Sequence, residues 1–149
     1  PLLSGAVLAG VDGDDLRSLR KIGEKLGIAF QLVDDVLGVF GQAQQTEKST
    51  VTDIRERKRT VLVQEACNRL NKEQQQELIA LYDVHHEMSQ QDIMRALELL
   101  TISGAKNAVM HEAKQLSEEA QKLIRELSMH ENAKQALLDL ITKMLSRNS

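Results

Sequence analysis

The sequence predicts an all-α protein, and three observations support that prediction. The 149 residues include one proline, at position 1, and only eight glycines, so few residues interrupt a helix. The long stretches between them are rich in Leu, Ala, Glu, Lys and Gln, which favour helices. Apolar residues recur there at steps of three and four, the spacing that places them on one helical face.

The first two predicted helices cover 1–10 and 16–40. The first is expected to be the buried end of a helix, closed by Gly10. Asp12 is suited to cap the second, because its carboxylate can accept a hydrogen bond from the first helical turn. The apolar stripe of the second helix consists of Leu16, Leu19, Ile22, Leu26, Ala29, Phe30, Val33, Leu37 and Phe40.

A third helix is expected over 53–70, because Asp53 followed by Glu56 forms a capping pattern. Its first half is rich in cations, which the positive end of a helix disfavours. These cations are Arg55, Arg57, Lys58 and Arg59. They either form a surface of exposed ion pairs or face an anion.

Four further helices are predicted in the remainder of the chain. A short helix over 72–82 follows Asn71, and Ser89 with Asp92 caps another that runs to about Ile102. After a break at Ser103 and Gly104, apolar residues predict helices over 105–127 and 132–145.

Composition limits the class of protein. The length suits one domain, and 42% apolar with 28% charged residues is typical of a globular protein. A net charge of −3 with a pI near 5.8 gives no support for nucleic-acid binding. The single cysteine, Cys67, excludes an internal disulfide and fits a reducing compartment, so a cytoplasmic location is expected. No apolar run is long enough to span a membrane.

The most informative stretch is Phe30–Gly38, FQLVDDVLG, near the end of the second predicted helix. Gln31, Asp34, Asp35 and Gly38 fall within an arc of about 100° on a largely apolar rod. Two adjacent aspartates are costly to desolvate unless a cation compensates them. They either face solvent or bind a hard divalent cation such as Mg²⁺, which leaves coordination positions for phosphate oxygens.

Two lysines follow this acidic pair, Lys48 in a polar loop and Lys58 near the start of the third helix. A Mg²⁺-bound diphosphate needs carboxylates for the metal and ammonium groups for the remaining phosphate charge. The pattern is therefore consistent with a diphosphate site in a helical cavity.

The run IAFQLVDDVLG…TEKSTVTDIRERKRTVLVQEA resembles the second aspartate-rich region of trans-type isoprenyl diphosphate synthases, the polyprenyl synthetase family. That family shows FQxxDDxxD, a loop containing GK, and an aspartate followed five residues later by a lysine and then a threonine. The matching positions are Phe30, Gln31, Asp34, Asp35, Lys48, Asp53, Lys58 and Thr60. The stretch SGAKNAVMHEAKQLSEEA resembles the C-terminal bundle of the family, so the likeness covers essentially the whole chain.

The resemblance implies the C-terminal part of the isoprenoid (polyprenyl) synthase fold, a helical bundle. The chain is expected to form one all-α domain over 1–149, with the second aspartate-rich region at 28–60 and C-terminal helices at 72–146. The implied reaction condenses isopentenyl diphosphate with an allylic diphosphate and releases pyrophosphate, with the help of three Mg²⁺ ions. The implied full-length protein is a homodimer.

Residue roles follow from the same resemblance. Asp34 would bind one Mg²⁺, and Asp35 would support that ligation or its water network. Lys48 and Lys58 would hold the allylic diphosphate. Gln31 would line the same side of the diphosphate site, and Phe30 is expected to contact the prenyl tail.

Three positions depart from the family pattern. Gly38 stands where the third aspartate of the motif is expected, and Glu47 and Arg57 each replace a glycine that precedes a lysine. These changes are consistent with a divergent or less active relative.

The first aspartate-rich motif of the family, DDxxD or DDxxxxD, does not occur in the 149 residues. The chain is therefore expected to be a piece of a longer enzyme and to have no turnover alone. Two other functions remain open: a catalytically impaired regulatory subunit of a heteromeric synthase, and a helical interaction module that uses 105–127.

Overall fold

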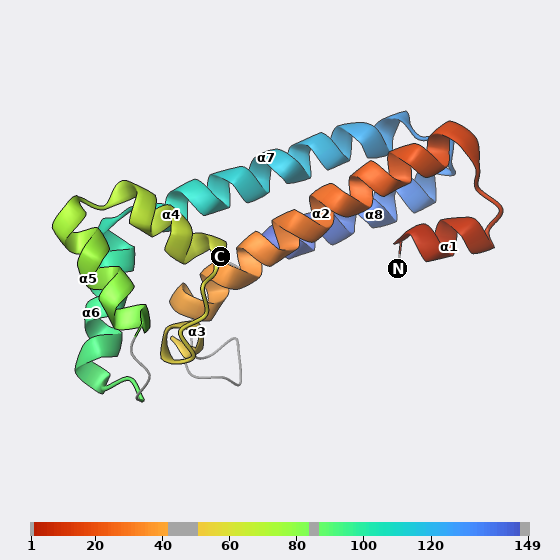
Figure 1. The fold of residues 1–149 in the computed structure, drawn as a ribbon. Helices are drawn as coiled ribbons and strands as arrows, with labels where there is room; N and C mark the ends of the chain where they lie inside the picture. The colour runs from red at the N-terminus through yellow and green to blue at the C-terminus, as the bar shows by residue number, and fades with distance from the viewer. Residues whose placement is uncertain (1, 42–50, 84–86, 147–149) are drawn as a thin grey trace. The chain divides into compact units, whose positions relative to one another are not determined.

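A computed structural model of the protein describes residues 2–41, 51–83 and 87–146, and these residues form helices without any strand (Figure 1). The all-α prediction is confirmed. In chain order the helices are α1 (Leu2–Leu8), α2 (Gly13–Phe40), α3 (Thr52–Arg55), α4 (Val61–Arg69), α5 (Lys72–Asp83), α6 (Gln90–Ile102), α7 (Ala105–Glu126) and α8 (Glu131–Ser146).

Most predicted helices agree with the structure to within a few residues at their ends. The capping prediction for α6 is confirmed, since the Ser89 side chain accepts from the Asp92 amide and Asp92 accepts from the Ser89 amide. Gly104, with φ of +68°, separates α6 from α7. The predicted burial of 1–10 is wrong for the end of α1, where Val7 and Leu8 are 61% and 89% exposed.

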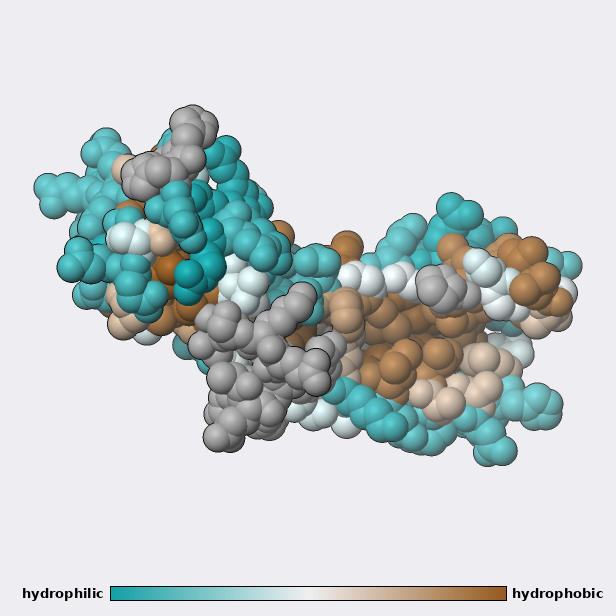
Figure 2. Space-filling view, turned by 90° about the horizontal axis from the view of Figure 1, so that it is seen from below, coloured by the Kyte–Doolittle hydropathy of each residue, from teal (hydrophilic) through white to brown (hydrophobic). Residues whose placement is uncertain are grey.

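The chain divides into two compact units, and the first comprises residues 1–31 and 112–149. It contains α1, the first part of α2, the later part of α7, and α8. In Figure 1 these parts of α2 and α7 run side by side, and an ion pair joins Lys25 to Glu119. The core of the unit consists of Ala6, Leu19, Ile22, Ala120, Ile124, Leu127 and Ile141. Figure 2 shows apolar side chains gathered on the surface of this unit.

The second unit comprises residues 32–111 and contains the end of α2, helices α3 to α6 and the start of α7. Helices α4, α5 and α6 pack against one another, and α3 packs on α6. The fully buried side chains include Ile54, Leu62, Leu78, Ile93, Leu99 and Val109. This unit holds both aspartates of the central stretch and Lys58.

The third predicted helix, over 53–70, is wrong as a continuous element. Helix α3 ends at Arg55, and α4 begins only at Val61. The amide of Arg57 donates to the Ile54 carbonyl and the amide of Lys58 to the Asp53 carbonyl, each at 2.9 Å. These two bonds form a Schellman motif, which reverses the chain at the end of α3.

Arg57 occupies the left-handed position of this motif, with φ of +50°, where glycine is usual. Its Nε donates to the Leu81 carbonyl in the last turn of α5 at 3.2 Å. This bond holds the arginine in a backbone conformation that a side chain disfavours. The sequence pattern did not reveal the break, because the bond to Leu81 spans 24 residues.

Candidate functional site

The two adjacent aspartates of α2 have different surroundings. Asp34 is exposed and has no hydrogen-bond or ion-pair partner among the described residues. Asp35 is only 5% exposed, and its Oδ2 accepts a hydrogen bond from the Val61 amide at 3.3 Å. Since Val61 is the first residue of α4, this amide is one of the donors that a helix leaves unpaired at its start. Asp35 therefore caps α4 from another helix, which leaves Asp34 as the open carboxylate of the pair.

Asp53 is not the helix cap that the sequence predicted. The cap position of α3 belongs to Val51, with φ of +71° and no side-chain hydrogen bond, and Asp53 lies inside the helix. Asp53 is 9% exposed, and its Oδ1 accepts a hydrogen bond from Lys58 Nζ at 2.5 Å. The Schellman motif makes this pair possible, because it turns Lys58 back toward the helix that carries Asp53.

Lys58 is also paired with Glu56, at 3.2 Å, while its side chain stays 49% exposed. Hydrogen bonds to Asp53 and then Glu56 raise the pKa of the Lys58 ammonium above its usual value. The ammonium has three donors, so one remains for a ligand when both carboxylates are engaged. A charged, half-exposed lysine of this kind can neutralise a phosphate oxygen.

The Asp53 carboxylate lies directly against Gly38 of α2. A Cβ built on Gly38 would be 3.0 Å from Asp53 Oδ1, and still closer to Oδ2 and Cγ. Gly38 is four residues beyond Asp34, so the two share one face of α2. The Asp53 carboxylate therefore contacts α2 about one helical turn beyond Asp34, and Asp53 in turn holds Lys58.

The other predicted site residues are less defined by the structure. Phe30 and Gln31 lie one turn before Asp34 on α2, and both are exposed, Phe30 by 46%. Lys48, together with Glu47, lies outside the described residues. Thr60, the last position of the motif, has a buried Oγ1 without a hydrogen-bond partner in the described part of the chain. The candidate site therefore depends on the open carboxylate of Asp34 and on Lys58, which Asp53 links to α2 at Gly38.

The carboxylates near Asp34 suit a divalent metal that is only partly coordinated by protein groups. Across residues 2–41, 51–83 and 87–146, no three His, Cys, Asp or Glu side chains converge to form a complete metal cage. Mg²⁺ does not need such a cage, because it keeps several waters and binds one or two carboxylates together with substrate phosphates. Asp34 fits that requirement as a single open ligand, so the residues suit a metal that binds together with a diphosphate.

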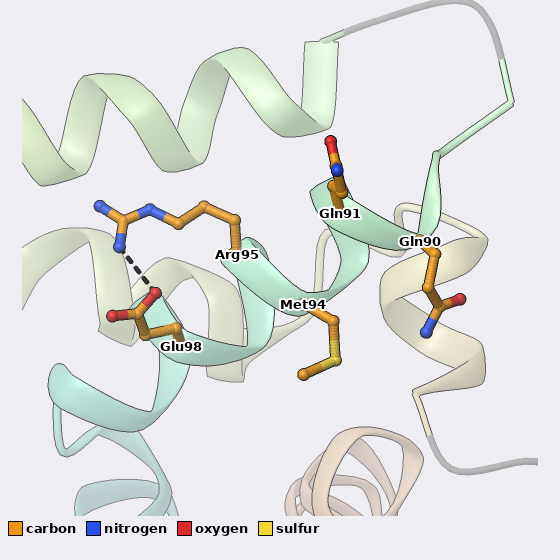
Figure 3. Close-up of a pocket in the computed structure, with 5 residues that line it drawn as sticks. All are labelled: Gln90, Gln91, Met94, Arg95 and Glu98. Atoms are coloured by element: carbon orange, nitrogen blue, oxygen red, sulfur yellow. Dashed lines mark hydrogen bonds and ion pairs between the residues drawn. The ribbon is translucent and has the colours of Figure 1, made fainter.

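Two pockets of the second unit lie apart from these residues. The pocket in Figure 3, about 520 Å³, is lined by side chains of α6 alone: Gln90, Gln91, Met94, Arg95 and Glu98. Arg95 binds Glu98 there, and its second partner is Glu77 of α5. A second pocket of about 390 Å³ lies between α4 and α5 and includes Thr60 and Tyr82. Neither pocket contains Asp34, Asp35 or Lys58.

Two residues that shape the site were missed as site residues. Asp53 was predicted as a helix cap and as a matching position of the family motif, but was given no role in the site, and Gly38 was predicted only as a missing ligand. The five-residue separation of Asp53 and Lys58 could have indicated their pairing, but only if a chain reversal between them had been recognised. The sequence gives no direct signal for the contact between Asp53 and Gly38, because they belong to different helices.

The fold and these contacts together define an all-helical protein with an open carboxylate on α2 and a half-exposed ammonium whose partner acid packs on the same helix. These two kinds of group suit a metal-bound phosphate. The family model of polyprenyl synthetases matches residues 1–100. The chain belongs to the polyprenyl synthetase family.

Among curated relatives, the geranylgeranyl diphosphate synthase of Mycobacterium tuberculosis is 37% identical over 100 residues, 67% of this chain and 28% of that protein. The geranylfarnesyl diphosphate synthase of Aeropyrum pernix is 30% identical over 137 residues, 92% of this chain and 42% of that protein. The chain thus spans less than half of the length of either relative.

Solved structures give the same result for the fold. A geranylgeranyl pyrophosphate synthase from Corynebacterium glutamicum, complexed with isoprenyl diphosphate and magnesium, matches with a TM-score of 0.84 at 33% identity. The match covers 96% of this chain and 40% of that protein. The helical arrangement is therefore that of the family, and no described helix is long and apolar enough to cross a membrane.

Proposed function

We propose that this chain carries one wall of the active site of a trans-prenyltransferase, which condenses isopentenyl diphosphate with an allylic diphosphate. Family membership supports this reaction class, and both named relatives are prenyl diphosphate synthases. The observation that carries the proposal is a pair of groups: the open carboxylate of Asp34 on α2, and the ammonium of Lys58, which Asp53 links to the same helix at Gly38. These are the two kinds of group that a metal-bound diphosphate requires.

Each residue has a distinct part in the proposed wall. Asp34 would hold Mg²⁺ through its free carboxylate, and Asp35 would support it indirectly by fixing the start of α4. Lys58 would donate to a diphosphate oxygen, and we retain Lys48 in the same role. Bound Mg²⁺ would supply charge stabilisation for the departing pyrophosphate. Lys58 would add to that stabilisation because its ammonium is already in place before the ligand binds.

Gln31 and Phe30 extend the proposed wall along α2. Both are exposed one helical turn before Asp34, where Gln31 could donate to the diphosphate and Phe30 could contact the prenyl tail. Cytoplasmic location and a homodimeric full-length enzyme remain part of the proposal.

Binding of inorganic pyrophosphate to the 149-residue chain, measured by calorimetry with and without Mg²⁺, tests this function. We expect binding that requires Mg²⁺ and that weakens at least tenfold in Asp34→Ala and Lys58→Gln. Glu112→Gln and Lys114→Gln, exposed residues of α7, are the matched controls and should bind normally. Absence of Mg²⁺-dependent binding to the unmodified chain would refute the proposed wall.

The second expectation concerns turnover. Because the 149 residues contain no first aspartate-rich motif, we expect the chain alone not to catalyse the condensation. A steady release of pyrophosphate by purified chain with Mg²⁺ and both substrates would contradict this expectation.

A regulatory subunit without activity of its own is the second candidate, and Gly38 is the observation in its favour. An intact first aspartate-rich motif in the parent polypeptide would count strongly against it. No observation favours a helical interaction module, since Ala105, Val109, Ala113, Ala120 and Ile124 of the α7 stripe are buried within this chain.

A further inference from the structure

Asp53 combines three features that the proposed function does not explain. Its carboxylate is almost fully buried, it holds the Lys58 ammonium at 2.5 Å, and it lies against the backbone of α2 at Gly38. A buried acid beside an anion site is unfavourable by its charge alone. Its presence there calls for a compensating role.

The contact with Gly38 excludes a side chain at that position. Real Cβ atoms essentially never approach other atoms within 3.0 Å, and two atoms of the Asp53 carboxylate would lie closer than this to a Cβ on residue 38. The obstructing group is a short, buried carboxylate with an ionic partner, so a shift of this carboxylate would disturb its pair with Lys58. Position 38 and the location of the lysine are thus sterically coupled.

The coupling is specific to Gly38. Gly27 lies in the same helix, and a Cβ there would meet no atom within 4 Å. Both glycines are inside α2, where alanine is the better helix former by about 1 kcal/mol. A side chain could thus replace glycine at position 27 without a clash, whereas glycine at position 38 makes room for the Asp53 carboxylate.

We propose that Asp53 is a positioning residue for Lys58, and that the absence of a side chain at Gly38 is what allows it to act. This proposal rests on the proposed function, in which Lys58 binds a diphosphate. Asp53 fills the place of a side chain on α2, one turn beyond Asp34, and holds the lysine from that position. The lysine is then oriented before the ligand arrives, so no ordering cost remains at binding.

A positioning role and a purely electrostatic role of Asp53 predict opposite effects of Asp53→Asn on pyrophosphate binding. If Asp53 acts only as a negative charge near an anion, Asp53→Asn should tighten pyrophosphate binding. If Asp53 positions Lys58, Asp53→Asn should weaken Mg²⁺-dependent binding on the order of tenfold, the effect of one misplaced charge-assisted hydrogen bond. Lys58→Gln should weaken it at least as much, and adding Asp53→Asn to Lys58→Gln should have little further effect.

The steric coupling between Gly38 and Asp53 is tested without any ligand, by denaturant unfolding of the 149-residue chain. Gly27→Ala should stabilise α2, whereas Gly38→Ala should destabilise the protein and bring the pKa of Lys58, followed by NMR of its side chain, back toward the usual value. In an Asp53→Ala background, Gly38→Ala should no longer destabilise, because the obstructing carboxylate is gone.

The outcomes are distinguishable. Unchanged or tighter binding in Asp53→Asn, or a Gly38→Ala variant as stable as Gly27→Ala with an unshifted Lys58, overturns the positioning role. Lack of pyrophosphate binding by the unmodified chain overturns the proposed function and leaves the Gly38–Asp53 coupling to be judged by the unfolding experiment.

Discussion

Replacement of each adjacent aspartate by alanine should have opposite consequences, although the two residues are chemically identical neighbours. Asp35 is buried and caps α4 through the Val61 amide at 3.3 Å, whereas Asp34 is exposed and has no partner among the described residues. Asp35→Ala should therefore destabilise the protein, and Asp34→Ala should leave its stability nearly unchanged.

The expected size of the effect follows from these contacts. Loss of a helix cap costs about 1 kcal/mol, and a carboxylate near the positive end of a helix contributes about 0.3–1 kcal/mol more. The distance of 3.3 Å is at the long end for a hydrogen bond, so a total of about 1–2 kcal/mol is expected. In a chain of this size that corresponds to a fall in Tm of about 3–6 °C. An exposed substitution such as Asp34→Ala should stay within about 0.5 kcal/mol of zero.

Urea unfolding followed by circular dichroism, together with pyrophosphate calorimetry, measures both properties on the same samples. We expect Asp35→Ala to lose stability, Asp35→Asn to lose less because it keeps an acceptor oxygen, and Asp34→Ala to lose binding alone. Equal destabilisation by Asp34→Ala and Asp35→Ala would refute the different roles of the two residues. Unfolding of Asp35→Ala at the same urea concentration as the unmodified chain would refute the capping role of Asp35.

Two further predictions concern the turn after α3. Arg57→Gly should be more stable than Arg57→Ala by about 1 kcal/mol in the same unfolding assay. Both variants lose the bond to Leu81, but only glycine adopts the positive φ without strain. Equal stabilities would show that the left-handed conformation carries no cost. Since the folded-state pKa of Lys58 is raised, its contribution to stability should be fully present below the unfolded pKa near 10.5 and be lost as pH rises through the higher folded value. Unfolding between pH 9 and 12 should therefore show a steeper loss in the unmodified chain than in Lys58→Met, and parallel curves would count against the Asp53–Lys58 pair.

Much of the fold could be predicted because its determinants are local. The apolar spacing of α2, α7 and α8 and the capping box at Ser89 involve residues three or four apart, which any helix brings together. The segment from 52 to 61 could not be predicted in this way. Its course depends on bonds to distant groups, from Arg57 to the Leu81 carbonyl and from the Val61 amide to Asp35.

The same limit applies to the candidate site. The sequence placed Gln31, Asp34, Asp35 and Gly38 in one arc of about 100°, which was correct as helical geometry. Periodicity could not tell which edge of that arc would be covered. Packing of the start of α4 buries Asp35, while Asp34, one position earlier, stays exposed. Assignment of a metal ligand from a pair of adjacent acids thus requires knowledge of the neighbouring helix.

The three aspartates of this region differ in what engages their carboxylates, and this difference assigns them different parts in the proposed site. Asp35 and Asp53 are engaged by groups of the protein itself, the first with α4 and the second with Lys58, so both organise the 52–61 segment on α2. Only Asp34 keeps its carboxylate open for a metal. Because a preorganised charge stabilises a developing anion without reorganisation, the placement of Lys58 by protein contacts alone would favour departure of pyrophosphate. The absence of a side chain at Gly38 is then better explained as room for the carboxylate that orients this lysine than as the loss of a ligand.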